Sequence, residues 1–331
     1  MDKEILVRII RDATYPDLSR HSPAGTMKWN NITFTEDPIA ECDYLIVINS
    51  TTQSIYVKTL KGGKWLFTQE SPVPDYVWQK KLFPFFDRVY SFWEDSAGPQ
   101  YREQTCLPWH IDRTYDELIV LRHEDLKPKR DQVSWVTSNN AHKPGQKVRL
   151  EFLRHIQDSE FPLGLYGRGF NPIDDKFDGI APYKYSIAME NYACEHYWTE
   201  KISDCFLSWT MPIYFGCTNI LDYFPKESMI IIDPKKPDEA MRIIESAIKN
   251  NLWEKSLSAI KEARELMLNK YNFFPAMAHR VEEHFNALPT NTRAPRQWSF
   301  LPVNTPNDTF SVSDKLKIHF RHLNTVIKNI L

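Results

Sequence analysis

Short apolar runs separated by polar segments make up the first part of the chain. A strand that is buried on both faces of a parallel sheet has this kind of continuous apolar sequence. The pattern predicts strands at 4–10, 43–50, 65–70, 88–94 and 117–123. A charged segment with a proline, 124–132, then interrupts the pattern, and we interpret it as a linker.

The strand pattern resumes after this linker, with helical periodicity between the strands. Strands are predicted at 132–139, 163–169, 185–191, 211–216 and 228–233. Strands that alternate with helices are typical of parallel sheets. The chain is therefore expected to be an α/β protein with two Rossmann-like domains facing a cleft.

The clearest helix is predicted at 199–209. Its apolar residues fall at the spacing of one helix face, namely Ile202, Cys205, Phe206 and Trp209. Other helices are expected to begin near Pro144, to cover 235–250 and to continue to about residue 287.

We expect an N-terminal domain at 1–127, a second domain at 128–290 and a C-terminal extension at 291–331 that packs back on the body. The segment 288–310 is rich in Pro, Thr and Asn, which predicts an extended path that could cross back over the first domain. The tail at 314–331 alternates apolar residues with Lys and Arg. It could dock on the body, which is the commoner role of a short amphipathic helix, or make a peripheral membrane contact.

Composition limits the classes of function. The 331 residues suffice for two domains, and the net charge of −2 gives no reason to expect a nucleic-acid partner. Five cysteines without metal-ligand or C-x-x-C spacing suit a reducing compartment. The N-terminus lacks a signal-peptide pattern, and no apolar run approaches the roughly 18 residues of a membrane span. A cytoplasmic location is expected from these features.

Lys201 lies where the helix at 199–209 should begin. A helix N-terminus is partially positive, so a cation there is unfavourable unless an anion lies in front of it. Thr199 is a candidate N-cap whose hydroxyl can accept a backbone N–H. Free N–H groups, the helix dipole and the ammonium together would bind a phosphate, whereas the alternative is a solvated lysine on a surface turn.

Arg149 repeats this arrangement. A strand ends at Ser138-Asn139, a polar loop follows, and Arg149 lies in the early turns of the helix that begins near Pro144. A guanidinium can hold two phosphate oxygens, and open α/β sheets bind nucleotides at the carboxyl ends of their strands. Two such cations in one domain favour a diphosphate site.

Other nucleotide and metal motifs are absent from the sequence. It contains no G-x-G-x-x-G fingerprint, no P-loop and no Asp-x-Asp. Asp174-Asp175 is interpreted as a turn. Neither a metal nor a cofactor is therefore expected, and side chains would supply the positive charge.

Glu70 ends an apolar strand and precedes two prolines. A carboxylate at a strand end can act as a general base if it faces a cleft. The alternative is a loop carboxylate that caps a turn or forms an ion pair.

Four motifs resemble the α-1,3/4-fucosyltransferases of glycosyltransferase family 10, in their bacterial or viral type. The family pattern Y-K-F corresponds to Tyr183-Lys184-Tyr185, and F-E-N corresponds to Met189-Glu190-Asn191. The pattern Y-x-T-E-K corresponds to Tyr197-x-Thr199-Glu200-Lys201, and P-[IV]-x-x-G corresponds to Pro212-Ile213-Tyr214-Phe215-Gly216. Weaker matches are Ser138, Asn139 and Arg149, then Tyr166-Gly167-Arg168, and the E-S-P motif at Glu70-Ser71-Pro72. The chain departs from the family at Tyr192, His196, Trp198 and Phe215, which neighbour the donor site.

The resemblance implies a GT-B architecture with GDP-L-fucose bound in the second domain. It implies inverting transfer to an O-3 or O-4 hydroxyl of N-acetylglucosamine or glucose in an oligosaccharide or glycolipid acceptor, with Glu70 as the base. Arg149 and Lys201 would stabilise the departing GDP, Glu200 would accept hydrogen bonds from ribose or fucose hydroxyls, and Asn191 and Tyr197 would hold the nucleotide. The residues expected at the donor site are Ser138, Asn139, Arg149, Tyr166, Gly167, Glu190, Asn191, Tyr197, Glu200 and Lys201.

Two alternatives remain open at this point. One is a GT-B transferase that uses a different GDP-deoxyhexose in surface polysaccharide synthesis. The other is a catalytically silent sugar-binding module.

Overall fold

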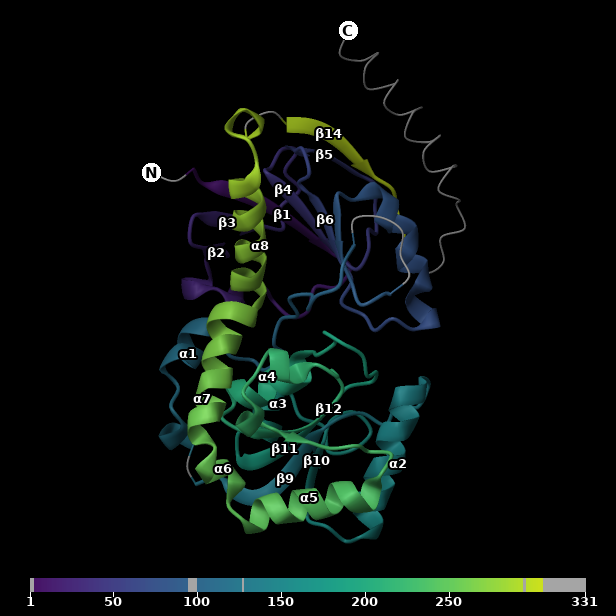
Figure 1. Ribbon diagram of the computed structural model, residues 1–331, viewed down its shortest axis with the longest axis vertical. Helices are drawn as coiled ribbons and strands as arrows, with labels where there is room; N and C mark the ends of the chain where they lie inside the picture. The colour runs from purple at the N-terminus through teal and green to yellow at the C-terminus, as the bar shows by residue number, and fades with distance from the viewer. Residues whose placement is uncertain (1–2, 95–99, 127, 294–295, 306–331) are drawn as a thin grey trace. The chain divides into compact units, whose positions relative to one another are not determined.

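The computed structural model describes residues 3–94, 100–126, 128–293 and 296–305, which form two compact α/β units (Figure 1). Unit 1 comprises the described residues of 1–15, 27–105 and 277 onward, and unit 2 comprises those of 16–26 and 106–276. This division differs from the expected boundaries after residues 127 and 290. The segment that begins at Cys106 belongs to unit 2 because Trp109, Ile111 and Leu118 are buried in a core of that unit.

Unit 1 is built on a seven-stranded sheet in the order β2-β3-β1-β4-β6-β7-β8, in which only the β2–β3 pair is antiparallel. The strands are β1 (Ile5–Arg11), β2 (Lys28–Trp29), β3 (Ile32–Thr35), β4 (Tyr44–Ile48), β6 (Lys64–Phe67), β7 (Arg88–Tyr90) and β8 (Gln100–Tyr101). The four strands predicted up to residue 94 are confirmed as β1, β4, β6 and β7. β4 is buried along its whole length, as its continuous apolar sequence indicates.

The strand predicted at 117–123 is wrong. Residues Tyr115–Val120 form helix α1 instead. The Thr114 hydroxyl accepts the backbone N–H of Glu117, and the Glu117 carboxylate accepts the backbone N–H of Thr114. This capping box satisfies the first donors of the helix and outweighs the strand-like composition of the apolar run.

Part of the C-terminal region lies against the rest of unit 1. Strand β14 (Arg296–Leu301) pairs with β5 (Ile55–Leu60) in an antiparallel two-stranded sheet. Helix α8 (Phe273–Ala287) contributes His284, whose Nδ1 lies 2.8 Å from the Tyr44 hydroxyl of β4. The amphipathic tail expected at 314–331 lies outside the described residues.

Unit 2 contains a five-stranded parallel sheet in the order β10-β9-β11-β12-β13. Its strands are β9 (Arg130–Val136), β10 (Leu163–Tyr166), β11 (Tyr183–Met189), β12 (Met211–Phe215) and β13 (Ile230–Ile231). All five confirm predicted strands, with ends shifted by a few residues. The order runs from β9 to β10 on one side and to β11 on the other, so the topological switch point lies between β9 and β11.

Helices cover both faces of this sheet. They are α2 (Pro144–Asp158), α3 (Lys176–Ile180), α4 (Glu200–Leu207), α5 (Pro237–Lys249), α6 (Leu252–Lys255) and α7 (Leu257–Leu266), followed by a π-helical turn at Met267–Tyr271. Ala188 of β11 packs in the core that includes Ile202 of α4, whereas its neighbours Ile187 and Met189 pack in the core that includes Phe152 of α2. This alternation is what a strand between two helical layers requires.

Helix α4 is shorter than the predicted 199–209, because Ser208 ends it and Trp209 adopts a positive φ of 54°. Across the described residues, no helix combines the length and the apolar character that a membrane span requires.

Candidate functional site

A cavity of about 360 Å³ lies within unit 2, at the carboxyl ends of β9, β10 and β11. This is the switch-point position at which open α/β sheets bind ligands. Its polar lining comes from Ser138 and Asn140 after β9, Arg149 of α2, Gly167 and Arg168 after β10, Lys176 of α3, and Glu200, Lys201 and Asp204 of α4.

Arg149 lies on the second turn of α2 and is almost fully buried. Nη1 donates to Asn191 Oδ1 (2.9 Å), and Nη2 donates to the Ser138 carbonyl oxygen (3.1 Å). Burial lowers the pKa of the guanidinium, which nevertheless stays charged near pH 7. Nε is buried and has no hydrogen-bond partner within the described part of the chain.

Two glycines make this geometry possible. A Cβ on Gly145, in the first turn of α2, would lie 1.7 Å from the backbone oxygen of Asn191. Gly167 has a φ of +108°, and a Cβ there would lie 2.0 Å from the Thr137 carbonyl oxygen. Both positions therefore need glycine to let the loops around the cavity approach each other.

Lys201 faces two carboxylates. Its Nζ lies 3.1 Å from Glu190 Oε2 and 3.2 Å from Glu200 Oε1. Burial alone would lower the pKa of Lys201, but these two carboxylates raise it above its ordinary value. A negative group was expected in front of Lys201 at the start of α4. In this structure the side chains of Glu190 and Glu200 provide it.

Thr199 is the N-cap residue of α4, but it does not cap the helix in the predicted way. Its hydroxyl makes no cap hydrogen bond to the helix backbone. It lies 2.8 Å from Glu190 Oε2 and accepts a hydrogen bond from Lys201 Nζ at 2.8 Å. The hydroxyl is instead engaged by Glu190 and Lys201, and Glu190, which is fully buried, also accepts the Thr199 backbone N–H at 2.8 Å.

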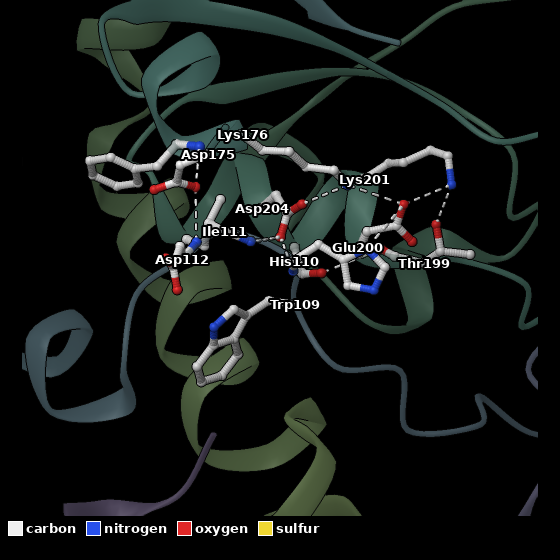
Figure 2. Close-up of polar contacts among 12 residues, drawn as sticks. Trp109, His110, Ile111, Asp112, Asp175, Lys176, Thr199, Glu200, Lys201 and Asp204 are labelled. Carbon is white, nitrogen blue, oxygen red and sulfur yellow. Dashed lines mark hydrogen bonds and ion pairs between the residues drawn. The ribbon is translucent and has the colours of Figure 1, made fainter. Parts of the chain in front are cut away.

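A row of alternating charges continues along α4 (Figure 2). Lys176 Nζ lies 3.3 Å from Glu200 Oε1 and 3.2 Å from Asp204 Oδ2. Burial alone would raise the pKa of Glu200, but Lys201 and Lys176 outweigh it and lower this pKa well below its ordinary value. Burial raises the pKa of Asp204 despite Lys176.

His110 lies beside this row, with Nδ1 4.0 Å from Glu200 Oε1. Burial lowers the pKa of the imidazole to about 4, so His110 is neutral near pH 7 and the contact is not an ion pair at that pH. Its backbone N–H donates to Asp204 Oδ1 at 2.8 Å.

The structure brings together part of the predicted donor site. Five of the predicted residues line the cavity, namely Ser138, Arg149, Gly167, Glu200 and Lys201. Glu190 and Asn191 contact two of these residues, through Lys201 and Arg149.

The other three predicted residues are not part of the cavity lining. Asn139 is exposed, and its neighbour Asn140 takes the position in the lining. The Tyr166 hydroxyl lies 2.7 Å from the Tyr183 hydroxyl. Tyr197 is buried and meets Tyr192 edge to face, with ring centroids 6.5 Å apart.

Glu70 belongs to unit 1, where it follows the carboxyl end of β6 and is partly exposed. The Tyr76 phenol donates a hydrogen bond to its carboxylate, and burial together with Glu70 raises the pKa of Tyr76. Glu70 thus has a defined hydrogen-bond donor and remains accessible, as a general base requires.

Asp174-Asp175 was interpreted as a turn, and Asp175 has a more specific role. It is the N-cap of α3, where Oδ1 accepts the Phe177 backbone N–H at 2.9 Å. Within the described ranges, no group of three or more His, Cys, Asp or Glu side chains is arranged to hold a metal ion.

Sequence reasoning missed Lys176, Asp204 and Asn140, and it named Arg168 only as part of the Tyr166-Gly167-Arg168 motif, without a role in the site. Asp204 lies four residues after Glu200, which places both carboxylates on one face of α4 and was a usable signal. Lys176 comes from a different element, and no local spacing relates it to Glu200.

The cavity lies in the part of the chain that matches a known family. Residues 126–252 match the family described as "Glycosyltransferase family 10 (fucosyltransferase) C-term". The chain is 25% identical over 229 residues to GDP-fucose protein O-fucosyltransferase 3 of Danio rerio, an alignment that covers 61% of this chain and 47% of that protein. It is 30% identical over 198 residues to the α-(1,3)-fucosyltransferase FucT of Helicobacter pylori, covering 53% of this chain and 40% of that protein. The chain thus spans about half the length of these relatives or less.

The fold is also similar to that of a solved α1,3-fucosyltransferase. That structure matches with a TM-score of 0.51 at 18% identity and covers 82% of this chain and 92% of its own chain. This similarity concerns the fold alone, and it confirms the predicted α/β fold class with GT-B architecture.

Proposed function

Because residues 126–252 match the fucosyltransferases of glycosyltransferase family 10, we propose that this chain transfers L-fucose from GDP-L-fucose to an acceptor hydroxyl. The observation that carries the proposal is the cavity of unit 2. It combines Arg149, with its unpartnered Nε, and Lys201 at the switch point of a sheet within the family domain. This arrangement suits a nucleoside diphosphate held by side chains.

In this proposal Arg149 and Lys201 bind the diphosphate and stabilise the charge that grows on it as it leaves. Such stabilisation increases the rate only to the extent that it is stronger in the transition state than in the ground state. Glu200 accepts hydrogen bonds from hydroxyl groups of the donor. Asn191 acts by holding Arg149, since the contact between them is already present.

The reaction is a single displacement that inverts the anomeric carbon. Glu70 removes the proton of the acceptor hydroxyl, and the acceptor oxygen forms a bond to C1 of fucose. The bond between C1 and the β-phosphate oxygen breaks, and GDP leaves with the electron pair. One base and one leaving group complete this chemistry, and no metal ion takes part in the proposed step.

The proposal includes two candidate classes of acceptor. An O-3 or O-4 hydroxyl of N-acetylglucosamine or glucose is the acceptor implied by the motifs. A serine or threonine hydroxyl of a protein is a second candidate, because protein O-fucosyltransferases are among the similar proteins. Transfer of another GDP-deoxyhexose remains the alternative for the donor.

An acceptor panel tests the proposal. GDP release from GDP-fucose would be measured in EDTA with N-acetyllactosamine, lactose, N-acetylglucosamine and a folded protein domain with exposed serines and threonines. Release that depends on one acceptor, and that persists in EDTA, is the expected result. Tight GDP binding without release from GDP-fucose, but with release from another GDP-deoxyhexose, would overturn the assignment of the donor. Failure to bind GDP would overturn the whole proposal.

A further inference from the structure

We propose that Lys176 is a positioning residue of the donor site, which fixes the Glu200 carboxylate and acts on the nucleotide sugar through it. The inference rests on the proposed function and adds a residue that the family motifs quoted above do not contain. It is built on the arrangement of Lys176, Glu200 and Asp204 (Figure 2).

Lys176 lies between two carboxylates that come from one helix. Its Nζ donates to Glu200 Oε1 at 3.3 Å and to Asp204 Oδ2 at 3.2 Å. The two carboxylates are four residues apart on α4, so one ammonium bridges successive turns of that helix. Burial would lower the pKa of Lys176, but Glu200 and Asp204 outweigh it and raise this pKa, which keeps the bridge charged.

Asp204 gives the bridge a fixed end. Its side chain is only 1% exposed, and Oδ1 accepts the backbone N–H groups of His110 at 2.8 Å and Ile111 at 3.3 Å. Because two backbone donors hold Oδ1, the whole carboxylate is fixed, including the Oδ2 atom that accepts from Lys176. Asp204 therefore holds Lys176, and Lys176 in turn holds Glu200.

The two lysines bind the same oxygen of Glu200. Lys176 and Lys201 both donate to Oε1, at 3.3 Å and 3.2 Å. Neither donates to Oε2, and Glu200 lines the cavity with 14% of its side chain exposed. In this inference Oε2, to which neither lysine donates, accepts a hydrogen bond from a hydroxyl of the donor, and the cations on Oε1 fix its direction.

Lys176 also reduces a repulsion. Glu200 and Asp204 both line the cavity, and their negative charges oppose a diphosphate. An ammonium between them offsets this charge. However, the dominant role assigned here is orientation, because both hydrogen bonds of Lys176 go to protein carboxylates.

A double-mutant cycle separates action through Glu200 from an independent effect. The dissociation constant of GDP-fucose would be measured by calorimetry, without acceptor, for the wild type, Lys176→Met, Glu200→Gln and the double variant. Lys176→Met should weaken binding by about tenfold in the wild-type background and by less than about twofold when Glu200 is already Gln. Lys176→Arg should restore most of the affinity, since a guanidinium can bridge the same two carboxylates.

Lys184 provides a matched control. It also bridges two carboxylates, Asp131 and Glu254, but it lies outside the cavity lining. Lys184→Met also removes two ion pairs, although to more exposed carboxylates, and should leave GDP-fucose binding unchanged. Thermal melting of every variant identifies any loss of GDP-fucose affinity that comes from unfolding.

The outcomes separate the inference from the function on which it rests. Equal losses in the two backgrounds, or no effect of Lys176→Met in the wild type, would overturn the role of Lys176 while the proposed function stands. Equal effects of Lys176→Met and Lys184→Met on the dissociation constant of GDP-fucose would also overturn this role. A wild-type protein that binds neither GDP nor GDP-fucose would overturn the proposed function and this inference with it.

Discussion

Lys201 holds the fully buried carboxylate of Glu190, with Nζ 3.1 Å from Oε2. Glu190 follows β11, and Lys201 lies in the first turn of α4, so this ion pair joins the two ends of the loop at 190–199. Lys201 also lines the cavity. The same ammonium therefore has a structural role and, in the proposed function, a role in binding the diphosphate.

These two roles can be separated by replacing both partners. Lys201→Met leaves the Glu190 charge buried without its cation. This should lower the free energy of unfolding by about 2–4 kcal/mol, slightly below the usual range for buried pairs because Lys201 is partly exposed. The double variant Lys201→Met with Glu190→Gln removes both charges and should recover most of that stability.

Denaturant unfolding and GDP titration of the same proteins check this prediction. GDP affinity should stay low in the double variant, since the cation is still missing. If the double variant recovers both stability and affinity, Lys201 has no direct role in binding the nucleotide.

Arg149 should not be replaceable by lysine. Its guanidinium donates to Asn191 through Nη1 and to Ser138 through Nη2 at the same time, which a single ammonium cannot reproduce with the same geometry. Arg149→Lys should weaken GDP binding by about 10- to 100-fold, as expected for loss of one to two charge-assisted hydrogen bonds.

Arg154→Lys is the control on the same helix, because Arg154 is exposed. It should bind GDP like the wild type. Equal GDP affinities of the two lysine variants, measured by calorimetry, would contradict the assignment of Arg149.

Glu70 should be needed for transfer but not for binding of the donor. Glu70→Gln removes the base and should lower kcat by about 10²- to 10⁴-fold, the usual contribution of a positioned general base. The GDP dissociation constant should change by less than about twofold, since Glu70 belongs to the other unit. Asp75→Asn neutralises a nearby exposed carboxylate and should keep wild-type turnover. Normal turnover in Glu70→Gln would exclude Glu70 as the base.

The stability of the protein should depend on Glu200 at acid pH. Lys201 and Lys176 lower the pKa of Glu200 against the effect of burial, so the unfolded chain binds a proton before the folded chain does. This contribution is fully present above about pH 4.5 and is lost as the pH falls through the lower folded-state pKa. The free energy of unfolding of Glu200→Gln should therefore fall less steeply than that of the wild type below about pH 4.5.

Denaturant unfolding at a series of pH values measures this difference. Burial raises the pKa values of Glu190 and Asp204, so these groups act in the opposite direction, and only the comparison with Glu200→Gln isolates Glu200. If the free energy of unfolding has the same pH dependence in the wild type and in Glu200→Gln, the lysines do not stabilise the Glu200 carboxylate.

The fold could be predicted from the sequence wherever apolar periodicity was strong. The strands of unit 2 have continuous apolar sequences because both faces are covered, and they were found. Short strands such as β2 and β8 have two residues each and carry no such signal. The error at α1 has a local cause, since the capping box of Thr114 and Glu117 outweighs the strand-like apolar run that follows it.

The candidate site was predictable only along single elements. Lys201 and Arg149 could be found because each lies at a helix start after a strand. Their partners depend on tertiary contacts: Glu190 reaches Lys201 across a loop, and Lys176 reaches Glu200 from another helix. Spacing along the chain contains no information on such contacts.

The most direct test of the account compares GDP with GMP. Their dissociation constants would be measured by calorimetry in EDTA for the wild type and for Lys201→Met with Glu190→Gln, the double variant that should keep its fold. If the cavity of unit 2 holds a diphosphate, GDP should bind the wild type at least about 100-fold more tightly than GMP, and the double variant should lose most of this preference. Equal affinities of the wild type for GDP and GMP would contradict the proposal that Arg149 and Lys201 form a diphosphate site.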